Sequence, residues 1–333
     1  MNTSVIILIL SLIVIIYFFY QPKDDYKERL IFYLGKDLYS KRSGSVNIDD
    51  YNNLIDINNF EKYEHPAQEY RGDAHKHIKS HFDEPLKKLI IKTGNGDRKF
   101  SYHPGDVWTG GVDENEMPSI ITIVKNRDRN ENKGVILRCL DLDRHWEFYY
   151  DKPKDISFDD KKDIIIWRGV STGKLSNPGN RFDLVKKWYN VDPQIDVGFN
   201  NIAQDKDEYR KYLKETQHPP QMLKNKYILS VEGNDKDSGL NWKLNSNSVV
   251  LMPKPLSTTW LMERKLIPNH HYILLKNDFS DLKAKLNWCM KNKKKCKNII
   301  KNANNYMSQF SNKEIEEKLE EDVIKLYFEK VTK

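Results

Sequence analysis

The sequence predicts an α/β protein built around a parallel sheet. In the stretch Lys226–Trp288, three short apolar runs, Tyr227–Val231, Ser248–Met252 and His271–Leu275, alternate with segments of helical pattern. Strands that alternate with helices are typical of parallel sheets, which bind ligands outside the carboxyl ends of their strands. The first run ends in an acidic, glycine-containing turn, Glu232–Asp235, where we expect a nucleotide sugar to bind.

Length and composition fit a folded protein of two ordinary domains or of one large domain. The chain has 333 residues, of which 38% are hydrophobic and 31% charged, so most of it is expected to fold in water. The net charge of +7 is spread along the chain, and its densest basic run, Lys291–Lys295, is interpreted as a solvated helix end. We therefore expect no nucleic-acid partner.

The three cysteines, Cys139, Cys289 and Cys296, are too few for a disulfide framework. Cys289 and Cys296 would pair in an oxidising compartment, or remain free thiols near adjacent helices. The sequence contains neither a CxxC pair nor an HExxH motif, so we expect neither a structural zinc site nor a zincin-type site.

The N-terminus predicts a membrane anchor. Val5–Tyr20 carries no charge, and 18–22 contains no small residues for signal-peptide cleavage, which favours an uncleaved transmembrane helix within 1–22. The expected protein is single-pass and membrane-bound, in an endoplasmic reticulum or Golgi-type lumen. Lys23 and Lys27 follow the span directly and favour the opposite orientation, which is left open.

Two domains are expected after the anchor, 23–154 and 155–310, separated at the turn-prone segment 151–154. The region 311–333 is predicted as a C-terminal helix. In the first domain, helical patterns precede strand-like runs, at Tyr26–Leu38, Pro85–Lys92, Ile120–Val124, Gly134–Leu140 and Trp146–Tyr150.

The second domain begins with a predicted strand, Asp163–Trp167, and a helix over Phe182–Tyr189, ahead of the three apolar runs described above. From Asp278 onward the pattern is helical, and Asp278 itself is predicted to be a helix N-cap. The predicted helices are Phe279–Met290, Lys295–Phe310 and Lys313–Lys330.

Two glycine turns are candidate phosphate sites. The apolar run 164–167 enters a turn that contains Arg168 and Gly173, and a diphosphate requires backbone N–H groups at close approach and a fixed cation. The turn after Val231 precedes Lys243, which would add positive charge. Glu263 could accept hydrogen bonds from ribose hydroxyls. Taken singly, each of these also fits a solvated turn or a surface glutamate.

The order of these motifs along the chain is more specific than any one of them. Together they resemble glycosyltransferase family 90, the group that contains lipopolysaccharide-modifying transferases, capsule xylosyltransferases and protein O-glucosyltransferases. The resemblance covers about residues 100–310. The motifs, in order, are GDV (105–107), Pro118, VKNR (124–127), RHW (144–146), WRGVSTG (167–173), Arg181, DVG (196–198), KYILSVEGND (226–235), SNSVVLMPKP (246–255), W-x-x-E (260–263), HYILL (271–275) and DFSDL (278–282).

The resemblance implies a GT-B architecture, in which two Rossmann-like domains face a cleft, with 23–154 on the acceptor side and 155–310 binding the donor. It also implies metal-independent transfer of a sugar from a UDP-sugar to a hydroxyl of a glycan or protein, with inversion and without a cofactor. Such chemistry requires a carboxylate to deprotonate the acceptor and cations to stabilise the departing diphosphate.

Residue roles carry over by position. Asp106 matches the family's general base, and Asp113 is the second choice because an apparent insertion, 108–116, blurs the match. Arg144 and His145 are expected on the acceptor side. The expected donor-binding residues are Trp167, Arg168, Gly169, Ser171, Thr172, Glu232, Gly233, Asn234, Asp235, Lys243, Ser248 and Glu263.

One departure from the family pattern leaves alternatives open. Relatives carry a basic residue shortly after the E-G-N-D turn, whereas Ser238–Asn241 contains none and the next cation is Lys243. Either Lys243 substitutes, or the chain is an inactive relative that binds glycans or partners. A third alternative is a metal-dependent GT-A enzyme in which Asp141 and Asp143 hold the ion. The transferred sugar and the acceptor are not specified by the sequence.

Overall fold

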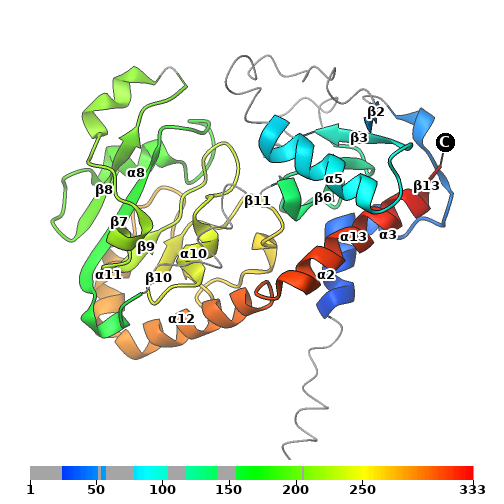
Figure 1. Ribbon diagram of the computed structural model, residues 1–333. Coiled ribbons are helices and arrows are strands. Elements are labelled where there is room, and N and C mark those ends of the chain that lie inside the picture. The colour runs from blue at the N-terminus through cyan, green and yellow to red at the C-terminus, as the bar shows by residue number, and fades with distance from the viewer. Residues whose placement is uncertain are drawn as a thin grey trace, which may run out of the picture.

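The computed structural model describes residues 25–51, 54–57, 79–103, 118–140, 155–204 and 206–332. Within these ranges the chain forms two halves, each with its own sheet, and a long C-terminal helix returns from the second half to the first (Figure 1). The predicted α/β class is confirmed.

The second half is organised around five parallel strands in the order β12-β10-β9-β7-β8. In chain order this is 5-4-3-1-2, so the strand order reverses between β7 and β9, the point at which doubly wound sheets bind ligands. The strands are β7 (Lys162–Val170), β8 (Ile195–Asn201), β9 (Asn225–Leu229), β10 (Val249–Met252) and β12 (Ile273–Leu274).

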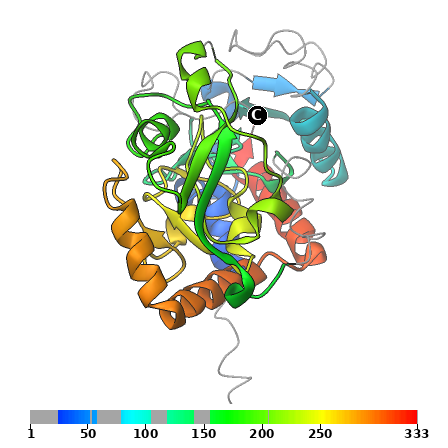
Figure 2. The same ribbon diagram turned by 90° about the vertical axis from the view of Figure 1, so that its left-hand side faces the viewer.

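Helices connect these strands and cover the sheet. Asn180 is the N-cap of α8, since its side chain accepts hydrogen bonds from the backbone N–H groups of Phe182 and Asp183. In Figure 2, α11 and α12 lie along one flank of the sheet. The helices are α8 (Arg181–Trp188), α9 (Pro219–Met222), α10 (Leu240–Leu244), α11 (Leu282–Lys291) and α12 (Lys293–Ser308).

The first half has a four-stranded sheet in the order β2-β3-β4-β6, in which the edge strand β2 runs antiparallel to β3. Its strands are β2 (Leu54–Asp56), β3 (Lys99–His103), β4 (Thr122–Val124) and β6 (Val135–Ile136). Its helices are α2 (Asp25–Leu34), α3 (Lys36–Tyr39) and α5 (Glu84–Lys92).

Several contacts join the two halves. Helix α13 (Lys313–Lys330) ends in β13 (Val331–Thr332), which pairs with β1 (Val46–Asn47). Strand β11 (Ser257–Thr258) pairs with β5 (Arg127–Asp128) of the first half.

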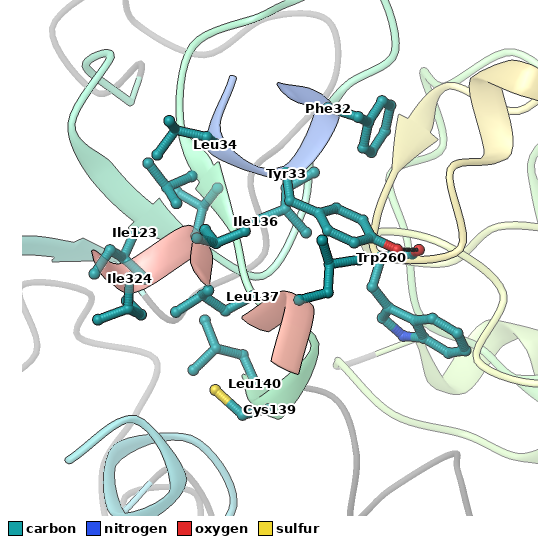
Figure 3. Close-up of a cluster of buried hydrophobic side chains, with 14 of the residues drawn as sticks. Phe32, Tyr33, Leu34, Ile123, Ile136, Leu137, Cys139, Leu140, Trp260 and Ile324 are labelled. Carbon is teal, nitrogen blue, oxygen red and sulfur yellow. Dashed lines mark hydrogen bonds between the residues drawn. The ribbon is translucent and has the colours of Figure 1, made fainter. Parts of the chain in front are cut away.

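Side chains reinforce this junction. The Tyr33 hydroxyl of α2 donates to the Trp260 carbonyl at 2.6 Å, inside an apolar cluster that both halves share (Figure 3). Nearby, Arg29 and the α13 residue Glu316 form a buried ion pair at 2.6 Å. The carboxyl edge of the large sheet is thereby held next to the first half.

The GT-B prediction is not confirmed. A doubly wound, all-parallel sheet is found only in the second half of the described chain, whereas the first half has a smaller sheet of mixed direction. The expectation of two similar Rossmann-like domains facing a cleft is therefore not retained.

The prediction of an N-terminal transmembrane helix is also corrected. A span needs about 20 mostly apolar residues, and none of the helices in the described part of the chain is both long enough and apolar enough. The segment Val5–Tyr20, on which the prediction was based, lies outside the described residues. The expectation of a single-pass protein held in an endoplasmic reticulum or Golgi-type membrane is not retained.

Candidate functional site

The loops that follow β7 and β9 meet at the point where the strand order reverses. Gly173 has a φ of +111°, and a Cβ there would lie 2.8 Å from the carbonyl oxygen of Gly233. A Cβ on Gly233 would lie 2.7 Å from the Thr172 hydroxyl oxygen. Only glycine permits this close approach of two backbones at the carboxyl edge of the sheet.

Arg181 connects the two loops from the first turn of α8. Its Nε donates to the Val231 carbonyl at 3.2 Å, and its Nη1 donates to the Val170 carbonyl at 2.9 Å and to the Thr172 hydroxyl at 2.8 Å. Among the described residues, none accepts a hydrogen bond from Nη2. The side chain is thus fixed in place and retains donor capacity for an anion.

A buried ion pair lies beneath the β9 loop. Lys243 pairs with Asp237 and donates to the Leu229 carbonyl at 3.1 Å, while the Ser230 hydroxyl donates to Asp237 at 2.7 Å. Burial opposes ionisation of Asp237, but the Lys243 ammonium and the Ser230 hydroxyl prevail and lower the pKa of this carboxyl. The Lys243 ammonium is therefore engaged by Asp237 and the Leu229 carbonyl, and it stabilises the loop after β9.

A second cation, Lys236, extends from the same loop into a cavity that Glu232 and Glu263 also line. Its Nζ lies 5.4 Å from the ring centroid of Trp260, and the residue is 7% exposed. Burial lowers the pKa of Lys236 to about 7, against the opposing effect of Glu263. The charge of this amine therefore changes near neutral pH.

The two glutamates of the cavity are held by donors of neighbouring loops. Glu232 accepts from the backbone N–H groups of Leu256 at 3.0 Å and Ser257 at 3.1 Å, and burial raises its pKa to about 8. Glu263 accepts from the N–H of Thr259 at 2.6 Å and from its hydroxyl at 2.8 Å. Both carboxyls are thus fixed at the rim of the sheet, where they can accept hydrogen bonds from hydroxyl groups.

One residue of the first half reaches this loop. Lys125 follows β4 directly, and its Nζ lies 2.9 Å from the Asp235 carboxylate, with both side chains largely buried. The ion pair connects the carboxyl edges of the two sheets. Asn234, beside it, accepts from the Gln204 side-chain amide at 3.2 Å.

Several of the residues predicted from the sequence are brought together at this edge. They are Thr172, Glu232, Gly233, Asn234, Asp235, Lys243 and Glu263.

Other predicted donor residues lie elsewhere or are bound within the fold. Arg168 forms an ion pair with Asp196 of β8, in which its Nη2 donates to both carboxylate oxygens, at 3.1 and 2.9 Å. Ser171 exchanges hydrogen bonds with the backbone of Ala203. Ser248 precedes β10 and so lies at the opposite, amino edge of the sheet.

Trp167 and Gly169 form one packing unit in β7. The Trp167 ring is buried and meets Phe199 edge to face, with ring centroids 5.7 Å apart. A Cβ on Gly169 would lie 2.6 Å from the Trp167 ring, so the glycine makes room for the indole. The structure thus places Trp167 in the core and Gly169 beside it, near the loops.

The predicted general-base candidates Asp106 and Asp113 and the predicted acceptor-side residues Arg144 and His145 lie outside the described residues, and so do Asp141 and Asp143. In the described part of the chain, no group of three or more His, Cys, Asp and Glu side chains is arranged to hold a metal ion. The metal alternative therefore rests on residues that the structure does not describe.

Sequence reasoning did not assign Arg181, Lys236 and Lys125 to the site. Arg181 follows an N-cap asparagine immediately after a glycine turn, a pattern that places its side chain at the carboxyl edge of the sheet. Lys125 belongs to a segment that was already part of the resemblance. Lys236, between two aspartates, gives no such signal.

Comparison with known proteins identifies the family. The Glycosyl transferase family 90 profile matches residues 144–331. The chain is also 33% identical over 242 residues to the O-glucosyltransferase LpsA of Dichelobacter nodosus, which covers 72% of this chain and 70% of that protein. The chain belongs to glycosyltransferase family 90.

The resemblance found in the sequence is thus confirmed, and this family 90 chain is a glycosyltransferase, which binds a sugar donor and an acceptor. A shorter match, 31% identical over 102 residues, relates it to the uncharacterized protein 179R of Invertebrate iridescent virus 6 and covers 29% of this chain and 9% of the viral protein.

Proposed function

We propose that this glycosyltransferase moves a sugar from a UDP-sugar to a hydroxyl group of a glycan or protein acceptor, with inversion at the anomeric carbon and without a metal ion. The observation that supports this most strongly is the position of Arg181. Its guanidinium bridges the loops after β7 and β9, at the reversal of strand order where α/β sheets bind nucleotides.

The leaving group carries most of the charge that the enzyme must stabilise. When the bond from the sugar to the diphosphate breaks, the β-phosphate gains negative charge, which fixed cations stabilise without reorganisation. We assign this role to Arg181, at the start of α8, and to Lys236, on the loop after β9. Two protein cations in this position support transfer without a metal, since they supply the charge that an ion provides in other transferases.

The donor's hydroxyl groups need acceptors of hydrogen bonds. Glu263 and Glu232 line the cavity beside Lys236, and their carboxyl groups are held by backbone donors. We propose that Glu263 binds the ribose and that Glu232 faces the ribose or the sugar.

The general base is proposed to be Asp106, as the family pattern implies, with Asp113 second. An inverting transfer requires this carboxylate to take the proton of the acceptor hydroxyl as the oxygen attacks the anomeric carbon from the face opposite the diphosphate. Asp106→Asn should abolish transfer and leave UDP affinity nearly unchanged. Transfer that survives in Asp106→Asn and is lost in Asp113→Asn would move the role to Asp113.

UDP-glucose is the first donor to test, because a relative is named an O-glucosyltransferase. Hydrolysis of UDP-glucose, UDP-xylose and UDP-galactose is measured with and without EDTA. Activity that chelation does not change supports the proposal, while activity lost with EDTA and restored by Mn²⁺ favours the metal-dependent alternative. The absence of UDP binding and of hydrolysis would favour an inactive relative.

A further inference from the structure

A groove on the far flank of the second half is separate from the donor site. It lies among α11, α12 and the edge strand β12, which pairs only with β10 in the described sheet. Its floor is apolar, formed by Ile273 and Ile299, which are 2% and 5% exposed. Its polar rim is the part that can recognise a ligand.

An indole ring forms one wall of this groove. Trp288 is 37% exposed, and the Lys295 Nζ lies 5.7 Å from the centroid of its ring. Lys285 lies one helical turn before Trp288 on α11, so the two share a face. The groove therefore combines a flat apolar surface with two cations.

Amide side chains complete the rim. Asn298 and Asn302 lie three and seven positions after Lys295 on α12, and so face the groove in one stripe, and Asn269 lines it from the loop before β12. An indole beside amides suits a sugar ring, whose C–H face packs on the aromatic ring while its hydroxyls exchange hydrogen bonds with the amides.

The charges of the rim are not balanced by the protein. No carboxylate is among the described residues that line the groove, and neither Lys285 nor Lys295 pairs with one in the described part of the chain. Two neighbouring lysines differ, because Lys297 pairs with Asp159 at 2.6 Å and Lys293 lies 3.8 Å from Asp163. The cations at the groove thus remain available to an anionic ligand.

We propose that this groove is a second carbohydrate-binding site, which takes an acidic oligosaccharide by stacking a sugar ring on Trp288 and pairing its carboxylate or phosphate groups with Lys285 and Lys295. Carboxylates lie beside two lysines of the same helix, Asp163 near Lys293 and Asp159 on Lys297, so α12 does not present the continuous cationic stripe that nucleic acid requires. A concave rim rich in amides likewise fits a sugar better than a lipid surface.

Isothermal titration of the full chain with trigalacturonate and with neutral maltotriose tests this site. We expect trigalacturonate to bind, maltotriose to bind at least about tenfold more weakly, and Trp288→Ala and the double variant Lys285→Gln/Lys295→Gln each to raise the trigalacturonate Kd at least about tenfold. The double variant changes only lysines of the rim, so it tests the site even if Trp288→Ala fails to fold.

Two control variants distinguish binding in this groove from binding at the donor loops or elsewhere on α12. Lys297→Gln removes an ion-paired lysine of the same helix, and Arg181→Ala alters the donor loops; both should bind trigalacturonate like the native chain. The proposal is overturned if trigalacturonate does not bind at about 5 mM, or if it binds the native chain and the double variant equally. It is also overturned if oligothymidylate or phosphatidylglycerol vesicles bind in a Trp288-dependent way while trigalacturonate does not.

Discussion

Donor affinity should fall steeply between pH 6 and pH 8 because Lys236 loses its charge in that interval. The amine is buried beside Trp260, and this burial lowers its pKa to about 7 in the free protein. Glu232 acts in the same direction, since its pKa is raised to about 8 and its ionisation adds a negative charge to the cavity as the pH rises. Both titrations thus lower the affinity for an anionic donor as the pH rises.

The size of the effect follows from the fraction of the amine that is charged. If the bound diphosphate keeps Lys236 protonated, the Kd varies with pH as the inverse of the protonated fraction in the free protein. For a pKa of about 7 this fraction is about nine in ten at pH 6 and about one in eleven at pH 8, so the Kd should rise about tenfold. Ionisation of Glu232 would enlarge this change.

Titration calorimetry with UDP-glucose, in the absence of acceptor, measures this dependence. The sugar diphosphate has no phosphate that titrates between pH 6 and pH 8, unlike UDP itself. Lys236→Arg should keep the affinity and reduce its pH dependence to the part due to Glu232, and Lys236→Met should bind weakly at every pH. Lys254→Arg, an exposed lysine of the same cavity, should behave like the native chain. A Kd that is constant from pH 6 to pH 8 in the native chain would refute the assignment of Lys236.

Three further changes probe the site and its support. Arg181→Lys loses the geometry that bonds the Val231 and Val170 carbonyls, so calorimetry should show the UDP-glucose Kd raised at least about tenfold; an unchanged Kd would remove Arg181 from the donor site. Gly173→Ala places a Cβ in a left-handed backbone next to Gly233 and should lower the free energy of unfolding by about 1–3 kcal/mol in urea titrations. An unchanged free energy of unfolding would contradict this, because it would mean that the loop shifts without cost. Glu316→Gln leaves Arg29 buried without its carboxylate, and the same titration should show a loss of about 3–5 kcal/mol; a loss below about 1 kcal/mol would contradict the pairing.

The sequence predicted the second half well because its strands are short apolar runs between strong turn signals. The predicted strand Ser248–Met252 differs from β10 by one residue, and the C-terminal helix Lys313–Lys330 has the observed bounds. β8 was not predicted as a strand because its alternating polar residues, as in DVGFNN, weaken the apolar signal, and pairing with β7 determines its conformation. The order of the strands in the sheet could not be predicted, because it depends on which strands pair, and the local sequence does not specify that.

Local signals failed where tertiary contacts determine the conformation. Asp278 was predicted as an N-cap, yet α11 begins at Leu282, because Phe279 adopts a left-handed φ of 54° that interrupts the turn and lets its ring enter the core. Arg168, whose role as the diphosphate cation stays a prediction, pairs with Asp196 on the neighbouring strand. Neither contact is visible from residues adjacent in sequence.

The segment Ser238–Asn241 contains no basic residue, and the packing around Gly239 leaves no space for a longer side chain there. A Cβ on Gly239 would lie 2.8 Å from the Trp242 indole nitrogen and 3.2 Å from Cε of Lys243, so the space for a longer side chain at this position is already occupied. Lys243 does not replace the cation, because Asp237 and the Leu229 carbonyl hold its ammonium beneath the loop. Lys236 lies three positions earlier, in the loop itself, and lines the cavity directly. Among the described residues of the β9 loop, the cation that lines the cavity is therefore Lys236, a buried amine with a pKa lowered to about 7, and the expected pH dependence of donor binding rests on this residue.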